Sequence, residues 1–502
     1  MPQLPIEILW IGLCTGLVFL MQAGFLCLES GLTRSKNNIN VAVKNLADLG
    51  ISLTLFWGLG YGLMFGQSYL GFIGISGFSP NLQASPGGET IYALYQAMFC
   101  GTAVTIVSGS IAERVRFRTY LLVAVVTSGI VYPIFGHWAW SDGESGAGWL
   151  KALGFFDFAG STVVHSLGGW TALALLMIIG PRTGRFTESG AAVKIPGSNL
   201  PMAVLGTLIL WFGWFGFNGG STLGFDEAIP NVLVNTVLAG AGGLVAAMVL
   251  GSIKDGQAEV ELLMNGSLAG LVAITANPLA ISTGNAILVG AIGALVMAGV
   301  DALLVRQRID DAVGAIPVHL GAGVWGTLAV PLFGDLQNMG ITNGVWEQLL
   351  VQGVAVTACG AWAFGLTYVV FRLVDAKVRL RVTPEEELTG LNISEHGAGS
   401  ELLELFTAMD QVSKTGDLSI RVPVEPFTEV GQIASRYNRV MDSLEVEVAR
   451  TEAVVGSSMD GIVTFSRDRL SIQSLNPAAS ELFGVTTEDV HQRLVTQLIA
   501  LE

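Results

Sequence analysis

The chain has 502 residues, of which 51% are hydrophobic and 13% are charged, and its mean hydropathy is +0.59. So few charges exclude a purely soluble protein of this length, and a formal net charge of −15 excludes a nucleic-acid-binding protein. The 64 glycines fit transmembrane helices that pack closely against one another. Composition therefore predicts an all-α polytopic membrane protein that has the lipid bilayer as a partner.

Long apolar stretches recur from the N-terminus to about residue 373. The first lacks the basic start of a signal peptide, so we expect it to be retained as a membrane helix. Eleven stretches are predicted to cross the membrane, at residues 6–28, 46–67, 91–111, 119–137, 162–180, 200–218, 232–252, 261–276, 286–305, 316–333 and 347–371.

The loops between these stretches alternate in charge. Arg34 and Lys36 follow the first stretch, the next loop (SPNLQASPGGET) has no basic residue, and Arg114 and Arg116 follow the third stretch. The last stretch again ends in basic residues, beginning with Arg372. Because basic loops stay inside, we expect the N-terminus outside and the tail in the cytoplasm of a bacterial-type cell (inner) membrane.

Two histidines stand in matching surroundings, although the chain has only 5 histidines. His165 lies in VVHSLGGWTAL and His319 in VHLGAGVWGTL, each on an apolar, glycine-rich run with a tryptophan a few residues later. A single membrane histidine could simply hydrogen-bond to a neighbouring helix. Two in corresponding halves favour a functional site, because transporters with similar halves place matching residues where the substrate binds.

A metal site is not expected at these histidines. Four cysteines lie in apolar runs without metal-type spacing, and only His137 remains as a third histidine in a predicted span. The cysteines fit buried small hydrophobic residues. We therefore expect neither a metal nor another cofactor.

Aromatic residues recur at helical spacing in three further motifs. Tyr95 and Phe99 are one turn apart in ALYQAMF, and WFGWFGFNGGS supplies Phe215, Phe217 and Ser221. HWAW supplies Trp138 and Trp140, beside an acidic loop. Aromatic side chains at this spacing commonly belong to a core or face lipid. Together they could instead form a cation–π vestibule for a small, weakly hydrated cation.

The acids near the two histidines are interpreted differently in the two halves. Asp157 lies eight residues before His165, where it could cap the following helix, stabilise a passing cation, or do both. Asp310 and Asp311 follow two arginines shortly before His319. For this second pair we expect a solvated or ion-paired role.

Several long motifs resemble the ammonium transporter (Amt/Rh) family, and they occur in the expected order. They are DFAGSTVVHSLGGWTALAL, IAERVRF, WFGWFGFNGGS, DDAVGAIPVHLGAGVWGTL and EEELTGLNISEHG, and the resemblance covers residues 5–397. It implies eleven transmembrane helices, arranged as an inverted 5+5 pseudo-repeat plus a last helix, and a homotrimer with one pore in each subunit. The family often has an acid five residues before the second histidine, where this chain has Gly314.

The resemblance also implies the path of ammonium or ammonia. The implied positions are pore-lining twin histidines at His165 and His319, ammonium recruitment at Trp140, Phe99, Ser221 and Tyr95, a gate at Phe99 and Phe217, and a buried acid at Asp157.

Residues 374–502 resemble signalling modules that follow the membrane domain 1–373. Residues 374–400 form a regulatory connector, and residues 401–450 resemble a HAMP signal relay. The apolar residues that fit the seam of a helical bundle are Val430, Ile433, Tyr437, Val440 and Leu444. Residues 451–502 resemble the opening half of a PAS domain, with a strand, a turn, a second strand and an Asn-Pro helix start. A histidine kinase or cyclase is expected to follow as the effector.

Three functions therefore compete. The first is an ammonium sensor-transducer that conducts and also signals to cytoplasmic partners. The second is a non-conducting ammonium receptor, and the third is a plain ammonium transporter with a regulatory tail. We do not expect an enzyme, because the chain shows no nucleophile–base or cofactor motif.

Overall fold

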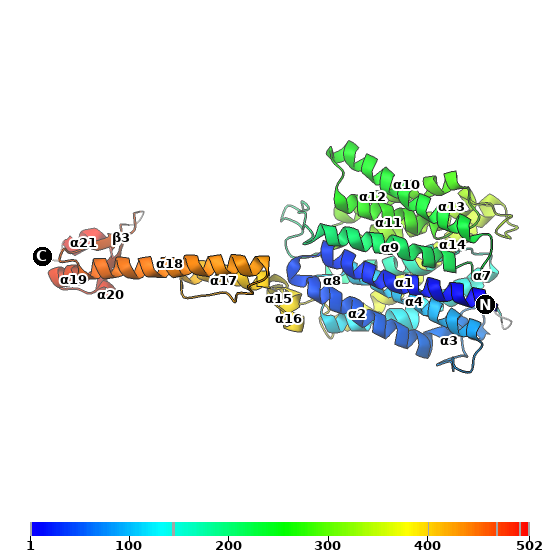
Figure 1. Cartoon of the computed structure of the whole chain (residues 1–502), viewed down its shortest axis with the longest axis horizontal. Helices are drawn as coiled ribbons and strands as arrows, with labels where there is room; N and C mark the ends of the chain where they lie inside the picture. The colour runs from blue at the N-terminus through cyan, green and yellow to red at the C-terminus, as the bar shows by residue number, and fades with distance from the viewer. Residues whose placement is uncertain (1–2, 143–145, 400, 468–469, 491–492, 500–502) are drawn as a thin grey trace. The chain divides into compact units, whose positions relative to one another are not determined.

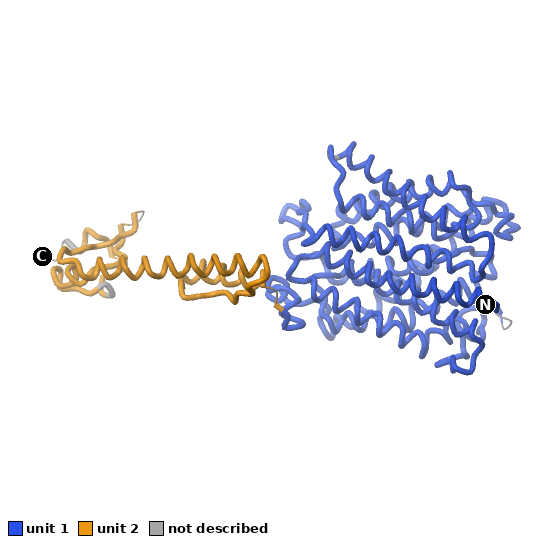
Figure 2. Tube along the Cα trace, in the orientation of Figure 1, with its two compact units in different colours: residues 1–398 blue, residues 399–502 orange. Residues whose placement is uncertain are grey.

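The computed structural model describes residues 3–142, 146–399, 401–467, 470–490 and 493–499. The chain forms two compact units, residues 1–398 and 399–502 (Figure 2). The connector residues up to 398 belong to the first unit. Each unit is described by itself below.

Unit 1 is a bundle of long helices (Figure 1). Its α-helices are α1 (Pro5–Leu32), α2 (Asn38–Leu55), α3 (Tyr61–Phe65), α4 (Gly87–Ser110), α5 (Phe117–Val126), α6 (Tyr132–Trp140), α7 (Trp149–Ala152), α8 (Leu167–Ile179), α9 (Leu200–Gly220), α10 (Ile229–Asp255), α11 (Val260–Ile274), α12 (Thr283–Arg306), α13 (Ala322–Phe333), α14 (Val345–Asp375), α15 (Pro384–Thr389) and α16 (Leu391–His396). A short hairpin, β1 (Ser68–Tyr69) with β2 (Ile73–Gly74), joins α3 to α4. We call the end where α1 begins the N-terminal side, and the end that holds α15 and α16 the connector side (Figure 1).

Ten helices among the described residues are long and apolar enough to cross a membrane. They correspond to ten of the eleven predicted stretches, and the eighth stretch forms α11, which has only 15 residues. At a rise of about 1.5 Å per residue, α11 reaches only about 22 Å. The chain is therefore a multi-pass helical membrane protein, and the count of eleven stays a prediction.

Four long helices contain a π-helical segment. They are η2 (Phe56–Gly60), η3 (Thr127–Val131), η4 (Ser161–Ser166) and η5 (Ile316–Gly321), while η1 (Ser35–Asn37) is a 3-10 turn. Each π segment widens the helix by one residue, and such segments often occur at functional sites. His165 lies in η4 and His319 in η5, so both histidines project from distorted turns.

Close packing explains part of the high glycine content. A Cβ atom on Gly206 of α9 would lie 2.4 Å from the backbone nitrogen of Leu28 in α1. A Cβ atom on Gly290 of α12 would lie 2.0 Å from the carbonyl oxygen of Ala239 in α10. Only glycine allows these backbones to approach so closely, as expected for helices packed within a bilayer.

Unit 2 begins with two helices of unequal length, α17 (Glu401–Thr415) and α18 (Glu429–Ser457). Leu405 and Ala408 of α17 pack with Val422 and Ala434, and Val430 and Tyr437 lie against this cluster. Thr428 caps α18 by accepting a hydrogen bond from the Gly431 N–H at 2.9 Å.

Three of the five predicted seam residues are exposed in this unit. Ile433, Val440 and Leu444 expose 52%, 54% and 44% of their surface. The cluster that joins α17 to α18 uses Val430, Ala434 and Tyr437, so these three exposed residues lie outside it.

The end of unit 2 is a small α/β element. Strands β3 (Val463–Phe465) and β4 (Ile472–Leu475) pair antiparallel, as the sequence predicts. Asn476 then caps α19 (Pro477–Phe483) by accepting a hydrogen bond from the Ala479 N–H. The remaining helices are α20 (Thr487–Val490) and α21 (Val495–Ile499).

Candidate functional site

The two histidines meet inside unit 1, although 154 positions separate them in the chain. Their Nδ1 atoms are 3.1 Å apart, and their rings stack with centroids 5.2 Å apart and an interplanar angle of 13°. His165 is fully buried and His319 is 4% exposed. Because one Nδ1 must donate and the other accept, two neutral rings share one proton between these nitrogens.

Aromatic rings continue from the histidines toward the N-terminal side. The centroid of Phe217 lies 5.4 Å from that of His165, and Phe99 lies 4.1 Å from Phe217 in a tilted stack. Tyr95 and Trp140 then lie 4.8 Å and 6.1 Å from Phe99, both edge-on. The structure thus brings four of the predicted aromatic residues into one continuous column that ends at His165.

Hydroxyl groups lie beside the end of this column that is on the N-terminal side, which we call its outer end. Tyr95 donates to the carbonyl oxygens of Gly216 and Phe217 at 2.9 and 2.8 Å, and its oxygen lies 3.3 Å from Oγ of Ser221. Ser221 and Trp140 are only partly buried, whereas Tyr95 is 1% exposed. The predicted recruitment residues are therefore in contact with one another, with polar oxygen atoms next to aromatic faces.

Asp157 fixes the backbone that carries His165. Its carboxylate accepts hydrogen bonds at 2.8–3.0 Å from the N–H groups of Gly160, Ser161, Thr162 and Val163. Burial raises the pKa of Asp157 to about 6, against the lowering effect of these four donors, so the group is ionised at neutral pH. The capping interpretation is thus confirmed, and Trp140 adds a bond from Nε1 to the Asp157 carbonyl oxygen at 2.8 Å.

Asp311 plays the same part for His319, which corrects the expectation of a solvated or ion-paired group. Its carboxylate accepts from the N–H groups of Val313, Gly314 and Ile316 at 3.4, 3.1 and 2.6 Å. Gly314 has a φ of +77°, and Gly160, at the corresponding position before His165, has a φ of +110°. Residues with side chains are strained at such positive φ values. The two acids therefore have matching surroundings, and the shared pattern Asp-x-x-Gly-x-x-x-Val-His is visible in the sequence.

Asp310 is ion-paired, as predicted, but it is also buried. Arg182 Nε lies 2.8 Å from its carboxylate and Arg185 Nε lies 3.2 Å away. Burial alone would raise the pKa of Asp310, but hydrogen bonds and charge from Arg182 and Arg114 lower it well below its ordinary value. Arg182 also bonds Glu113 at 3.0 Å, so these groups form a buried ionic network.

Other aromatic residues contact the histidines without having been singled out by the sequence. Trp214 stacks on His165 at 5.4 Å and 15°, and Phe25 lies 6.2 Å from His319. Trp214 could have been found from its position one turn before Phe217 on the same helix face. Phe215, by contrast, packs on Phe212 away from the column, and Trp138 packs on Trp149 and Trp362.

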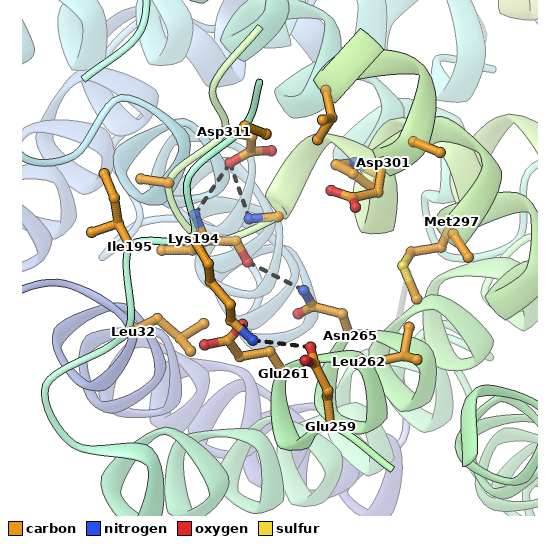
Figure 3. A pocket seen from close by; sticks show the side chains of 18 of the residues that line it. Leu32, Lys194, Ile195, Glu259, Glu261, Leu262, Asn265, Met297, Asp301 and Asp311 are labelled. Carbon is orange, nitrogen blue, oxygen red and sulfur yellow. Dashed lines mark hydrogen bonds and ion pairs between the residues drawn. The ribbon is translucent and has the colours of Figure 1, made fainter. Parts of the chain in front are cut away.

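A cavity of 540 Å³ opens on the connector side of the histidines. Asn265, Asp301 and Asp311 lie around it, and Lys194 pairs with Glu259 at 2.9 Å across one edge (Figure 3). A second cavity of 20 Å³ lies between this cavity and His319 and shares three lining residues with it: Asn265, Val313 and Gly314. Polar space therefore approaches His319 from this side.

The connector is fastened to the same side of unit 1. Lys36 Nζ donates to the carbonyl oxygens of Glu387 and Leu388 at 2.8 and 2.7 Å. Asn37 Oδ1 accepts from the Leu391 N–H at 2.9 Å, and Asn37 Nδ2 donates to Glu113 at 3.0 Å. Asn37 thus touches both the connector and the buried ionic network.

No group of three or more His, Cys, Asp and Glu side chains in the described ranges is arranged to hold a metal ion.

The comparisons with known proteins agree on one family. Residues 9–401 match the Ammonium Transporter Family. A transporter homologue from Synechocystis sp. is 51% identical over 97% of this chain and 92% of its own length, so the similarity includes unit 2. Ammonium transporter Amt2 of Archaeoglobus fulgidus is 40% identical, over 79% of this chain and 88% of its own.

Two solved structures share the fold of unit 1. A structure described as a sensor Amt protein has a TM-score of 0.76 and 42% identity, and the match covers 78% of this chain and 98% of that chain. Candida albicans Mep2 has a TM-score of 0.69 and 28% identity, and the match covers 76% of this chain and 87% of that chain.

Proposed function

Because the chain belongs to the Ammonium Transporter Family, we propose that it carries ammonium through unit 1 and couples this passage to signalling by unit 2. Its homologues are ammonium transporters, which are not enzymes. The observation that carries the proposal is the histidine pair, with Nδ1 atoms 3.1 Å apart directly behind the Phe99–Phe217 stack. This pair lies where the aromatic column ends.

Recruitment takes place at the outer end of the column. The faces of Trp140 and Phe99 attract a weakly hydrated cation, and Ser221 supplies an oxygen in place of lost water. The ionised carboxylate of Asp157 lies behind this site and stabilises the positive charge over a short distance. These interactions are sufficient to concentrate ammonium but leave it at the mouth of a narrow apolar gate.

Beyond the gate, the cargo moves as ammonia and the proton moves separately. A charge within a dry apolar path costs several kcal/mol, about 2.5–3.5 kcal/mol or more for side-chain charges. Phe99 and Phe217 are 1% and 0% exposed, and their rings offer no oxygen or nitrogen atom to an intact ammonium ion. Imidazole accepts and donates protons near neutral pH, which suits His165 and His319 to relay the proton.

Eleven membrane passages and an outside N-terminus complete this proposal. The passage that completes the count is α11, which is apolar and is buried among its neighbours along 10 of its 15 residues, so a short helix can cross without contacting lipid along its whole length. The basic residues Lys36, Arg116 and Arg182 lie on the connector side, which the positive-inside rule assigns to the cytoplasm. We further propose a homotrimer in a bacterial-type inner membrane.

Signalling would pass through the connector into the HAMP-like and PAS-like modules. Support comes from a chain of hydrogen bonds that begins at the connector and runs from Asn37 to Glu113 and from Glu113 to Arg182. Arg182 in turn bonds Asp310, which is next to Asp311, the residue that caps the His319 segment. The similar structure described as a sensor Amt protein favours sensing as well. A receptor that binds without conducting is therefore the second candidate, and a plain transporter is the third.

The test uses the full chain in proteoliposomes, with ammonium-evoked current and ammonium binding measured in parallel. We expect His165→Ala and His319→Ala each to lower the current about tenfold or more, the usual effect of losing a proton-transfer group. His137→Ala is the matched control, because His137 is equally buried but bonds Met64 and Ser68. Current that is unchanged in both variants contradicts the relay, and binding without current in the unaltered protein selects the receptor.

A further inference from the structure

Glu29 is a buried carboxylate that the pathway above does not use. It lies near the connector-side end of α1 and is 2% exposed. Its Oε2 accepts hydrogen bonds from Asn45 Nδ2 and Ser108 Oγ, both at 2.9 Å. Asn45 is held in turn by Thr105, whose hydroxyl donates to Asn45 Oδ1 at 3.0 Å. Side chains from α2 and α4 therefore fix one oxygen of this carboxylate.

Glu29 and His319 line the same small cavity. Its volume of 20 Å³ exceeds the roughly 10–15 Å³ that one water molecule requires. A buried water also needs two or more polar partners, and the Glu29 carboxylate, the His319 imidazole and the Asn265 amide provide them. The rest of the lining is mainly apolar, including Phe25 and Leu28, so a proton here has few other acceptors.

The small cavity connects His319 to the large one. Both are lined by Asn265, Val313 and Gly314, and the large cavity has a volume of 540 Å³. Of the two cavities, Glu29 lines only the small one, so it lies between the histidine pair and the large cavity.

A proton that reaches the histidine pair must leave it again, because a charged imidazolium is costly in a dry interior. We propose that Glu29 is the group that receives this proton on the connector side. The inference rests on the proposed function, since it assumes that a proton travels through the pair.

The transfer balances without another reactant. The His319 imidazolium gives a proton to the cavity water, which passes one of its own protons to Glu29, leaving neutral imidazole and a carboxylic acid. Glu29 then returns the proton to ammonia that arrives in the large cavity, which restores the carboxylate and forms ammonium. One ammonium ion disappears on the outer side and one appears on the connector side.

The test compares Glu29→Gln, Glu29→Asp and Asp48→Asn in the full chain, reconstituted in liposomes. Glutamine keeps the shape and an acceptor oxygen but cannot take up the proton, whereas aspartate can. Asp48 is the matched control, because it is a buried acid of α2 that bonds Tyr120 and lines neither of the two cavities described above. Ammonium-evoked current is measured together with ammonium binding by calorimetry.

We expect Glu29→Gln to lower the current about tenfold or more while the binding affinity stays within about twofold. Glu29→Asp should recover part of the current, and Asp48→Asn should keep it. A Glu29→Gln current equal to that of the unaltered protein overturns the inference and leaves the proposed function standing. Parallel loss of binding and current in Glu29→Gln overturns it in favour of a structural role. No current in the unaltered protein overturns the proposed function and this inference together.

Discussion

At the scale of single residues, most polar groups of the site have hydrogen-bond partners. Tyr95, Ser221 and Asp157 all have hydrogen-bond partners, whereas Nε2 of His165 is buried and has none among the described residues. A buried polar atom without a partner costs about 1–3 kcal/mol. His165 therefore keeps one imidazole nitrogen available for a hydrogen bond at the end of the aromatic column.

The first prediction concerns the recruitment of ammonium by Trp140. Replacing it with leucine removes a ring face near Phe99, and a cation–π contact contributes about 0.5–2 kcal/mol. We therefore expect Trp140→Leu to weaken ammonium binding about two- to thirtyfold, as measured by calorimetry. Trp138→Leu serves as the control, since Trp138 packs on Trp149 and Trp362 outside the column. Equal affinities in the two variants would exclude Trp140 from the binding site.

At the scale of elements, two π-helical segments present the histidines to each other. Each segment follows a loop in which an aspartate accepts several backbone N–H bonds and a glycine takes a positive φ. Asp157 and Asp311 thereby occupy donors that a helix start would otherwise leave without partners. The histidine geometry is therefore set by these two loops as much as by the histidines themselves.

The second prediction follows for Asp157 and Asp311. Replacing either residue with alanine leaves three or four buried N–H groups without an acceptor and should destabilise unit 1 by about 2 kcal/mol or more. Thermal unfolding of the detergent-solubilised chain measures this loss. Asp226→Ala is the control, because exposed Asp226 accepts a bond from the N–H of Ala228 and should change little. Unfolding temperatures that match the unaltered protein would refute the capping role.

At the scale of the molecule, Glu387 fastens the connector to the helices of unit 1. Glu387 is 2% exposed, bonds Arg381 Nη2 at 2.7 Å and accepts from the Thr183 N–H at 2.7 Å. Burial raises the pKa of Glu387, whereas the hydrogen bonds from Arg381 and the Thr183 N–H and the charge of Arg381 lower it. The lowering effects are larger together, so the pKa of Glu387 is below its ordinary 4.5. The ionised form therefore holds the connector in place.

The third prediction is a loss of this docking in acid. The pKa of Glu387 is lower in the folded protein than in the unfolded chain. The stabilising effect of the ionised Glu387 carboxylate is therefore complete above pH 4.5 and declines as the pH falls through the lowered pKa. A fluorescent probe on Thr389→Cys should become more mobile over that range, as measured by anisotropy. Glu387→Gln should raise the mobility at neutral pH, and Glu385→Gln, an exposed neighbour, should not. Mobility that does not change with pH would rule out Glu387 as the fastening group.

The sequence by itself determined most of the long elements and pointed to residues that the structure brings together. Runs of apolar residues placed the long helices of unit 1 to within a few positions at most ends, because a membrane helix must satisfy all its backbone groups internally. The start of the second stretch is an exception, since α2 begins at Asn38 and not at residue 46. The motifs around His165, Phe217 and Asp157 identified residues that lie together in the structure. The Asn-Pro start of α19 likewise followed from local capping chemistry.

Only the tertiary structure decided which of these residues touch and what surrounds them. It brought His165 to His319, added Trp214, separated Phe215 from the column, and gave Asp311 a capping role in place of a solvated one. It also left Ile433 exposed, because α17 packs against Ala434, Val430 and Tyr437 instead. The physical reason is that periodicity fixes the face of one helix, whereas contacts across the bundle depend on π segments, tight glycine crossings and loops that no local pattern specifies.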